Sequence, residues 1–238
     1  MTDGRERMIV ALDFPSYEKA HDFIEKLGDH VGFYKVGLEL FLNSRGKIVE
    51  FLKEKKKRIF LDLKFHDIPN TTAQAAVFAA NQDVFMFNVH AGGGKKMMKT
   101  VAEEVRKVNP KTLLIAVTVL TSISEAEARE TFHSTLDIKA LAVNLARLTK
   151  EAGLNGVVCS PWEAAEIKKE IGRDFVTVCP GIRLKDNATD DQERIMTPWD
   201  AIKSGCDYLV IGRPVTKAED PLTAADTIAR DIERALEA

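Results

Sequence analysis

Short β-rich runs alternate with helical patterns along the whole chain, and this alternation limits the possible folds more than any other feature. Eight runs have the composition of strands: residues 8–12, 32–36, 59–64, 84–90, 113–118, 156–159, 175–179 and 208–211. Amphipathic patterns lie between the runs, and the first places Ala20, Ile24 and Leu27 at helical spacing. Strands that alternate with helices favour parallel βα units.

Eight βα units in 238 residues fit a closed (β/α)8 TIM barrel, which usually has about 250 residues. An open, doubly wound parallel sheet is the structural alternative. Because no linker rich in Pro, Gly or Ser divides the chain, we expect a single α/β barrel domain over residues 1–238. In such a barrel the chemistry lies at the carboxyl ends of the strands, so side chains at those ends become the candidates.

The composition argues against several classes of protein. The chain has 34 Lys and Arg against 36 Asp and Glu, and therefore lacks the basic excess of a nucleic-acid binder. It also lacks an apolar run long enough for a membrane span or a signal peptide. Its three cysteines have no CxxC spacing, which favours reduced thiols. We expect a cytoplasmic protein with neither a nucleic-acid nor a membrane partner.

The segment IFLDLKFHDIPNT, residues 59–71, carries the strongest functional signal. Alternation along a strand places Asp62 and Lys64 on the same face as Phe60, opposite an apolar face. A carboxylate and an ammonium inside a barrel are costly unless they are paired or functional. Two interpretations stay open: a structural ion pair, or a catalytic array that also includes Asp67 in the following loop.

The two preceding strands also end in charged residues. Lys35, in FYKVG, lies on the face opposite Tyr34 and Val36, and Asp13 ends the first strand in ALDF. A lone lysine at a strand end is usually solvated, and Asp13 could equally cap the next helix. Convergence of both residues with Asp62 on one barrel mouth favours the functional interpretation.

The last two strands lead into segments suited to an anion. Gly212 lets backbone N–H groups approach a phosphate, and Arg213 can bind it with two parallel hydrogen bonds. Barrel phosphate sites often lie at this position, although a tight turn with a surface arginine is the alternative. The polar segment PGIRLKDNATDDQERI, residues 180–195, is long enough to form a lid.

The ordered set of strand-end motifs resembles the orotidine 5′-phosphate decarboxylases. In chain order the motifs are ALDF at Asp13, KVG at Lys35, D-x-K-x-x-D-I from Asp62 to Ile68, LTS at Thr121 and Ser122, PGIR at Pro180 to Arg183, and IGR at Gly212 and Arg213. The similarity runs from about Val10 to Pro221. It implies a homodimeric barrel without metal or organic cofactor. The implied reaction converts orotidine 5′-phosphate to uridine 5′-phosphate and CO₂ in de novo pyrimidine biosynthesis.

The same resemblance implies a role for each site residue. Lys64 would donate the proton to C6 of the pyrimidine, Asp62 would hold Lys64 in place beside the departing carboxylate, and Lys35 would contact Asp62 and the ribose. Three residues resemble those lent to the neighbouring subunit's site: catalytic Asp67 with Ile68 and Thr71. The other implied substrate contacts are Asp13 on the ribose, Thr121 and Ser122 on the pyrimidine, Pro180, Arg183 and Gln192 along the lid, and Gly212 and Arg213 on the phosphate.

Two other functions stay open. Metal-dependent sugar-phosphate decarboxylases and synthases of the same barrel group also carry D-x-K-x-x-D, but have a Glu that helps to hold Mg²⁺ where this chain has Lys35. A non-catalytic phosphate-binding barrel is the second alternative, which the costly charges of Asp62, Lys64 and Asp67 disfavour. Outside the array, we expect His90 to make a structural hydrogen bond, and Trp162 and Trp199 to pack against the fold.

Overall fold

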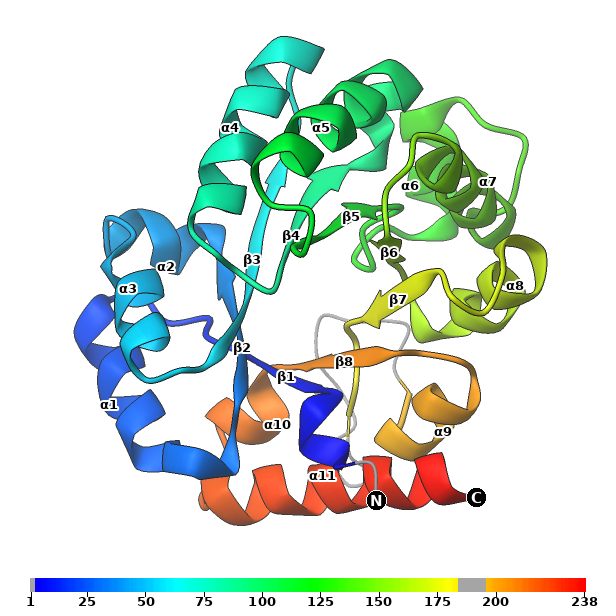
Figure 1. Ribbon diagram of the computed structural model, residues 1–238. Helices are drawn as coiled ribbons and strands as arrows, with labels where there is room; N and C mark the ends of the chain where they lie inside the picture. The colour runs from blue at the N-terminus through cyan, green and yellow to red at the C-terminus, as the bar shows by residue number, and fades with distance from the viewer. Residues whose placement is uncertain (1–2, 184–195) are drawn as a thin grey trace.

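A closed barrel of eight parallel strands forms the centre of the protein (Figure 1). The computed structural model describes residues 3–183 and 196–238. The strands are β1 (Met8–Ala11), β2 (Phe33–Gly37), β3 (Arg58–Phe65), β4 (Met86–His90), β5 (Leu113–Val117), β6 (Gly156–Val158), β7 (Val176–Cys179) and β8 (Tyr208–Ile211). Each strand pairs with the next, and β8 pairs with β1, which closes the barrel. The predicted barrel is confirmed, all eight runs hold a strand, and the open-sheet alternative is wrong.

Helices occupy the connections and surround the barrel (Figure 1). They are α1 (Tyr17–Leu27), α2 (Leu38–Asn43), α3 (Lys47–Glu54), α4 (Pro69–Asn81), α5 (Gly94–Val108), α6 (Glu125–Phe132), α7 (Ile138–Glu151), α8 (Pro161–Ile171), α9 (Pro198–Lys203), α10 (Arg213–Thr216) and α11 (Pro221–Glu237). Short 3₁₀ turns are η1 (Gly4–Glu6), η2 (Gly28–His30) and η3 (Ala91–Gly93). Side-chain caps set several starts: Ser16 caps α1, and Ser160 with Glu163 forms a capping box on α8.

Strand alternation divides the apolar side chains into two layers. The inward side chains fill the barrel: Ile9, Ala11, Phe33, Phe60, Met86, Ile115, Val178 and Val210. Outward side chains such as Val10, Tyr34 and Leu61 pack against the helices in a larger cluster. Since inward positions recur every second residue, Asp62 follows Phe60 toward the carboxyl end of β3. The packed barrel core therefore forms the floor of a polar site.

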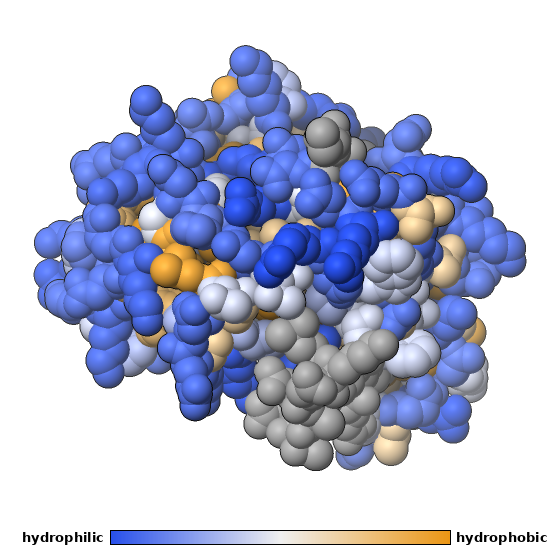
Figure 2. Space-filling view, turned by 90° about the horizontal axis from the view of Figure 1, so that it is seen from below, coloured by the Kyte–Doolittle hydropathy of each residue, from blue (hydrophilic) through white to orange (hydrophobic). Residues whose placement is uncertain are grey.

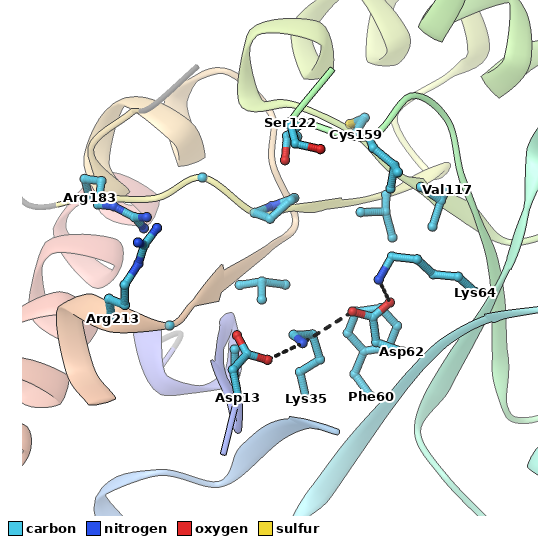
Figure 3. Close-up of a pocket in the computed structure, with 18 of the residues that line it drawn as sticks. Asp13, Lys35, Phe60, Asp62, Lys64, Val117, Ser122, Cys159, Arg183 and Arg213 are labelled. Atoms are coloured by element: carbon cyan, nitrogen blue, oxygen red, sulfur yellow. Dashed lines mark hydrogen bonds and ion pairs between the residues drawn. The ribbon is translucent and has the colours of Figure 1, made fainter. Parts of the chain in front are cut away.

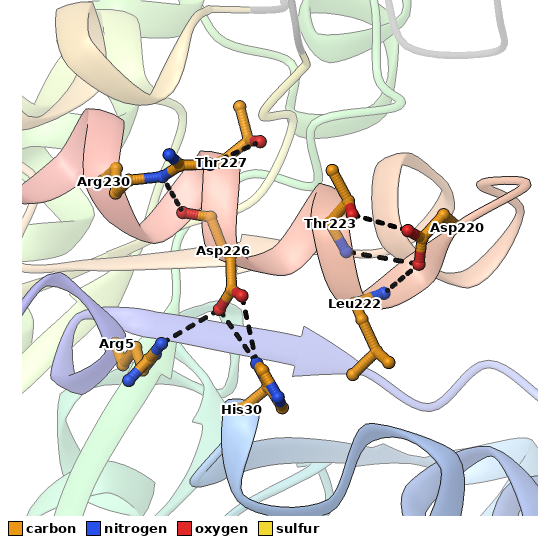
Figure 4. Close-up of polar contacts among 8 residues, drawn as sticks. All are labelled: Arg5, His30, Asp220, Leu222, Thr223, Asp226, Thr227 and Arg230. Atoms are coloured by element: carbon orange, nitrogen blue, oxygen red, sulfur yellow. Dashed lines mark hydrogen bonds and ion pairs between the residues drawn. The ribbon is translucent and has the colours of Figure 1, made fainter.

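The opposite end of the barrel is tied together by a charged cluster on α11 (Figure 4). The Asp226 carboxylate pairs with Arg5 Nη2 at 3.0 Å and with His30 Nδ1 at 3.1 Å. Arg5 lies in η1 and His30 in η2, just before β1 and β2. We call Arg5, His30 and Asp226 the closed-end cluster. It joins three segments that are distant in the sequence.

The surface is largely hydrophilic on the face seen in Figure 2, where a compact apolar patch and smaller scattered apolar groups interrupt it. No helix within residues 3–183 and 196–238 is both long enough and apolar enough to cross a membrane. The expectation that both tryptophans pack is only half right. Trp199 packs against the large apolar cluster, whereas Trp162 begins α8 with 58% of its surface exposed.

Candidate active site

A pocket of about 540 Å³ opens at the carboxyl ends of the strands (Figure 3). This is the end where barrel enzymes carry their chemistry. Ten of the predicted site residues line it: Asp13, Lys35, Asp62, Lys64, Thr121, Ser122, Pro180, Arg183, Gly212 and Arg213. The fold therefore brings together residues that are up to 200 positions apart in the chain.

Four of these residues form a row of alternating charges across the pocket floor. Lys35 Nζ lies 3.0 Å from Asp13 Oδ1 and 3.4 Å from Asp62 Oδ2. Lys64 Nζ lies 2.7 Å from the other carboxylate oxygen of Asp62. We call Asp13, Lys35, Asp62 and Lys64 the mouth array. Each charge in it has a neighbour of opposite sign, which offsets the cost of placing charges in a barrel.

Burial sets the electrostatics of the mouth array. Burial alone would raise the pKa of Asp62, but Lys35 and Lys64 outweigh it, so the pKa lies below that of an ordinary aspartate. Burial would likewise lower the pKa of Lys35, but the attraction of Asp62 and Asp13 holds it above that of an ordinary lysine. Both groups are therefore charged at neutral pH. The Lys64 side chain is the more accessible ammonium, with 39% exposure against 12% for Lys35.

The backbone of β3 departs from regular strand geometry where it carries Lys64. Lys64 has a φ of +50°, a left-handed conformation that costs a non-glycine residue about 1–2 kcal/mol. The pairing with β4 shifts register between Leu61 and Phe65. Such strain persists only where the surroundings hold it, and it is common at functional sites. Simple alternation predicts the correct side for Lys64 but not this irregularity.

Asn88 is a site residue that the sequence analysis missed. Its side chain is fully buried on β4, where Nδ2 donates to Asp62 Oδ1 at 2.7 Å. Its Oδ1 accepts the backbone N–H of Lys64 at 2.8 Å. Strand parity could have found it, since Asn88 is two residues beyond the inward-facing Met86. A buried amide at such a position needs partners.

Two arginines face each other on the other side of the pocket, away from Lys64 (Figure 3). Arg183 is held at its backbone, where its N–H donates to the Met196 carbonyl at 3.0 Å. Arg213 begins α10, directly after Gly212. The same wall includes Thr216 and Lys217, which the sequence analysis did not single out. Two guanidinium groups can bind an anion such as a phosphate.

Between these two charged ends, the wall combines hydroxyl and apolar groups. Thr121 and Ser122 line the pocket after β5, with Val117, Val158 and Cys159 nearby. Hydroxyl groups above an apolar wall suit a flat ring that carries polar edges. Thr121 and Ser122, expected to contact the pyrimidine, thus lie among the residues that line the pocket.

The loop after β3 lies outside the pocket. Asp67, Ile68 and Thr71 are exposed and do not line the cavity. The Asp67 carboxylate accepts the backbone N–H of Ile68 at 2.6 Å, and Ile68 is 68% exposed. A role for these residues within their own pocket is therefore not supported. Gln192, predicted in the lid, lies outside the described residues.

The rings of His66 and His90 stack beside Lys64, with their centroids 5.2 Å apart. The expected hydrogen bond of His90 is not found at Nδ1, which is buried without a partner among the described residues. Burial, together with His66 and Lys64, lowers the pKa of His90 below its ordinary value. In residues 3–183 and 196–238, His, Cys, Asp and Glu side chains form no group of three that could hold a metal.

Comparison with known proteins places this site in a family. Residues 6–228 match the Orotidine 5′-phosphate decarboxylase / HUMPS family. The orotidine 5′-phosphate decarboxylase of Chromobacterium violaceum is 48% identical over 94% of this chain and 91% of its own, and that of Syntrophotalea carbinolica is 44% identical over 100% and 99%. The crystal structure of the Lactobacillus acidophilus enzyme superposes with a TM-score of 0.84 at 37% identity, and covers 94% of this chain and 98% of that one. This chain therefore belongs to the Orotidine 5′-phosphate decarboxylase / HUMPS family.

Proposed function

We propose that this protein decarboxylates orotidine 5′-phosphate to uridine 5′-phosphate and CO₂, with Lys64 as the proton donor to C6. The observation that carries the proposal is the Lys35–Asp62–Lys64 row on one side of the pocket, with Arg183 and Arg213 on the other. A nucleotide fits this arrangement, because its base and its phosphate lie at opposite ends: the base would lie beside the lysines and the phosphate beside the arginines. The named relatives support the same reaction.

The chemistry requires a site that stabilises negative charge. When the bond between C6 and the carboxylate breaks, its electron pair stays on C6 and CO₂ departs. The Lys64 ammonium opposes this charge and then transfers its proton to C6, which leaves a neutral amine. Asp62 accepts from Lys64 Nζ at 2.7 Å and so fixes the donor before the reaction. The site is preorganised for the carbanion, and preorganisation of this kind is usually the largest catalytic contribution.

Lys35 argues against the metal-dependent branch of the group. Its ammonium occupies the space between Asp13 and Asp62, the two carboxylates that a divalent cation would need at this place. A second positive charge there would be repelled. We therefore propose a reaction without metal or organic cofactor, within de novo pyrimidine biosynthesis in the cytoplasm.

The decisive assay follows the loss of substrate absorbance as orotidine 5′-phosphate becomes uridine 5′-phosphate, with and without exhaustive EDTA treatment. We expect turnover in both conditions. Activity that disappears with EDTA and returns with Mg²⁺ would contradict the metal-free reaction, and turnover of a sugar phosphate in place of orotidine 5′-phosphate would move the chain to the sugar-phosphate branch. Binding of the product without turnover would indicate a non-catalytic phosphate-binding barrel.

We also propose that the protein is a homodimer whose subunits share their active sites. Leu38 and Leu42 on α2 and Phe78 on α4 are exposed, at 55%, 62% and 48%. The Phe41 and Phe78 rings are in contact, with centroids 6.4 Å apart, so α2 and α4 lie side by side. Ile68, at the start of α4, extends this exposed apolar area. Apolar area of this kind is typical of a protein interface.

A second copy covering this area would give the Asp67 loop a function. Asp67 adjoins Ile68 and does not line its own pocket, so we assign it to the partner's site. Inactive Lys64→Ala and inactive Asp67→Ala subunits can be mixed and allowed to exchange. If Asp67 acts across the interface, each heterodimer has one intact site and activity returns. If Asp67 acts within its own subunit, every site is damaged and the mixture stays inactive.

A further inference from the structure

Asn88 lies where β3 and β4 lose their regular pairing. Phe60 pairs with Met86 and Leu61 with Phe87, but the next pair is Phe65 with Val89. Residues 62–64 of β3 therefore stand opposite one residue of β4, which is Asn88. A bulge of this kind leaves backbone groups without ladder partners. The place of Asn88 at the bulge gives its amide two different tasks.

The first task is to hold the strained backbone of Lys64. The N–H of Lys64 donates to the side-chain oxygen of Asn88 at 2.8 Å, where a regular ladder would use a β4 carbonyl. Lys64 has a φ of +50°, which a residue with a Cβ keeps only when its surroundings hold it. Asn88 is 0% exposed, so water cannot replace this partner. The amide oxygen therefore stabilises the backbone turn that aims Lys64 into the pocket.

The second task is to fix the Asp62 carboxylate. Asp62 Oδ1 accepts from Asn88 Nδ2 and from Lys64 Nζ, each at 2.7 Å. The remaining oxygen faces Lys35 Nζ at 3.4 Å. A carboxylate held from the strand side by an amide cannot rotate freely, so its two lysine partners keep fixed positions. One side chain thus determines both the backbone of Lys64 and the group that orients its ammonium.

We propose that Asn88 is a positioning residue for the decarboxylation, which sets the place of the Lys64 ammonium through its backbone and through Asp62. This inference rests on the proposed function. Asn88 does not line the pocket and makes no contact with the space that the substrate would fill. Its removal should therefore affect the chemical step and leave binding of the nucleotide largely intact.

The test is a comparison of kcat, KM and uridine 5′-phosphate affinity for Asn88→Ala and Asn88→Ser. Misplacement of a catalytic group by a fraction of an ångström is expected to lower kcat by roughly 10- to 100-fold. KM and product affinity should change by less than about threefold, since Arg183 and Arg213 lie across the pocket. Asn88→Ser keeps a small polar group in the buried site, and carries the test if Asn88→Ala fails to fold.

Thr118→Val is the matched control. Thr118 is also fully buried near the carboxyl end of the barrel, but its hydroxyl donates to the Val158 carbonyl and touches no member of the mouth array. The Thr118→Val variant should therefore be less stable than the wild type but keep the wild-type kcat. If the folded Asn88 variants keep wild-type kcat, as Thr118→Val does, Asn88 is only structural and the inference is overturned. A wild-type protein without decarboxylase activity would overturn the proposed function itself, and this inference with it.

Discussion

Charged clusters lie at both ends of the barrel, and they differ in how far water reaches the carboxylate at the centre of each. In the mouth array, the Asp62 side chain is 10% exposed and lies between two lysines. In the closed-end cluster, Asp226 is 30% exposed, and its partners Arg5 and His30 are 44% and 46% exposed. Interactions between solvated charges are weak and screened by salt, whereas buried ones are strong but need full compensation.

This difference in exposure indicates a structural role for the closed-end cluster and a chemical role for the mouth array. The closed-end cluster joins η1, η2 and α11. Hydrophobic contacts can join such elements too, so this task does not require charged side chains. The mouth array holds the nearly buried charges of Lys35 and Asp62 in fixed positions, which stability alone does not require. Positioned charges in a water-poor pocket act strongly on a developing charge. The following changes test this contrast, from the largest expected effect to the smallest.

Lys64→Ala is expected to lower kcat by about 10³-fold or more, because it removes both the proton donor and a charge that opposes the carbanion. The barrel should remain folded and bind uridine 5′-phosphate, since Arg183 and Arg213 are untouched. Steady-state kinetics and product titration measure the two effects. Arg5→Ala in the closed-end cluster is the control and should keep its kcat. Near-normal turnover by folded Lys64→Ala would refute the assignment of the proton donor.

Asp62→Ala is expected to lower the free energy of unfolding by about 3 kcal/mol, because it removes the carboxylate between Lys64 and the nearly buried Lys35. Denaturant unfolding at neutral pH measures the loss. The corresponding change in the closed-end cluster, Asp226→Ala, should cost far less. Equal losses at the two ends would contradict the contrast between buried and solvated charges.

The pH dependence sharpens the same prediction. The pKa of Asp62 is lowered in the folded state, so its stabilising contribution is complete above the ordinary value of 3.8 and is lost as pH falls through the lower folded value. The pKa of Lys35 is raised, so its contribution is complete below 10.5 and is lost as pH rises through the higher folded value. The difference in unfolding free energy between wild type and Asp62→Ala should stay constant from about pH 5 to pH 9.

Arg213→Ala is expected to lower kcat/KM by about 10- to 100-fold, because charge-assisted bonds to phosphate contribute roughly 1.5–3 kcal/mol each. Part of the loss should fall on kcat, since remote binding energy also assists the chemical step. Orotidine, which lacks the phosphate, serves as the control substrate and should be almost insensitive to the change. An equal loss of kcat/KM for the two substrates would refute the assignment of Arg213 to the phosphate.

The sequence predicted the barrel because each strand carries a local signal. Apolar runs such as residues 208–211 are strand-like in themselves, and helical spacing separates them. Parity also placed Lys35 and Asp62 on the inner face, because alternation is a property of any strand. The barrel and its inward-facing charged residues could therefore be predicted from local patterns, combined with the rule that barrel enzymes carry their chemistry at the carboxyl ends of the strands.

What the sequence did not predict depends on contacts between distant segments. Parity places Asn88 on the inner face, but its contact with the Lys64 backbone follows from a register shift between β3 and β4, which no local pattern reports. The stacking of His66 on His90, and the burial of His90 Nδ1 without a partner in residues 3–183 and 196–238, depend on how the loop after β3 meets the end of β4. The exposure of Trp162 depends on which side of α8 meets the barrel. These features arise only when the elements are assembled, and they lie where pairing is irregular or a helix surface is left uncovered.

Asp226→Ala is expected to have the smallest effect, a loss of about 0.5–1 kcal/mol in the free energy of unfolding. Hydrogen bonds from His30 and Arg5, which lower the pKa of Asp226, are formed on a surface where water competes with them. Raising the salt concentration to about 1 M should remove much of this loss, because screening at that ionic strength acts within a few ångströms. The loss in Asp62→Ala should change less with the same salt, since Asp62 and its partner Lys35 are nearly buried. Unfolding curves of both variants at low and high salt measure the contrast. A salt-independent loss above about 2 kcal/mol for Asp226→Ala would mean that the closed end is held by a desolvated pair like the one at the mouth.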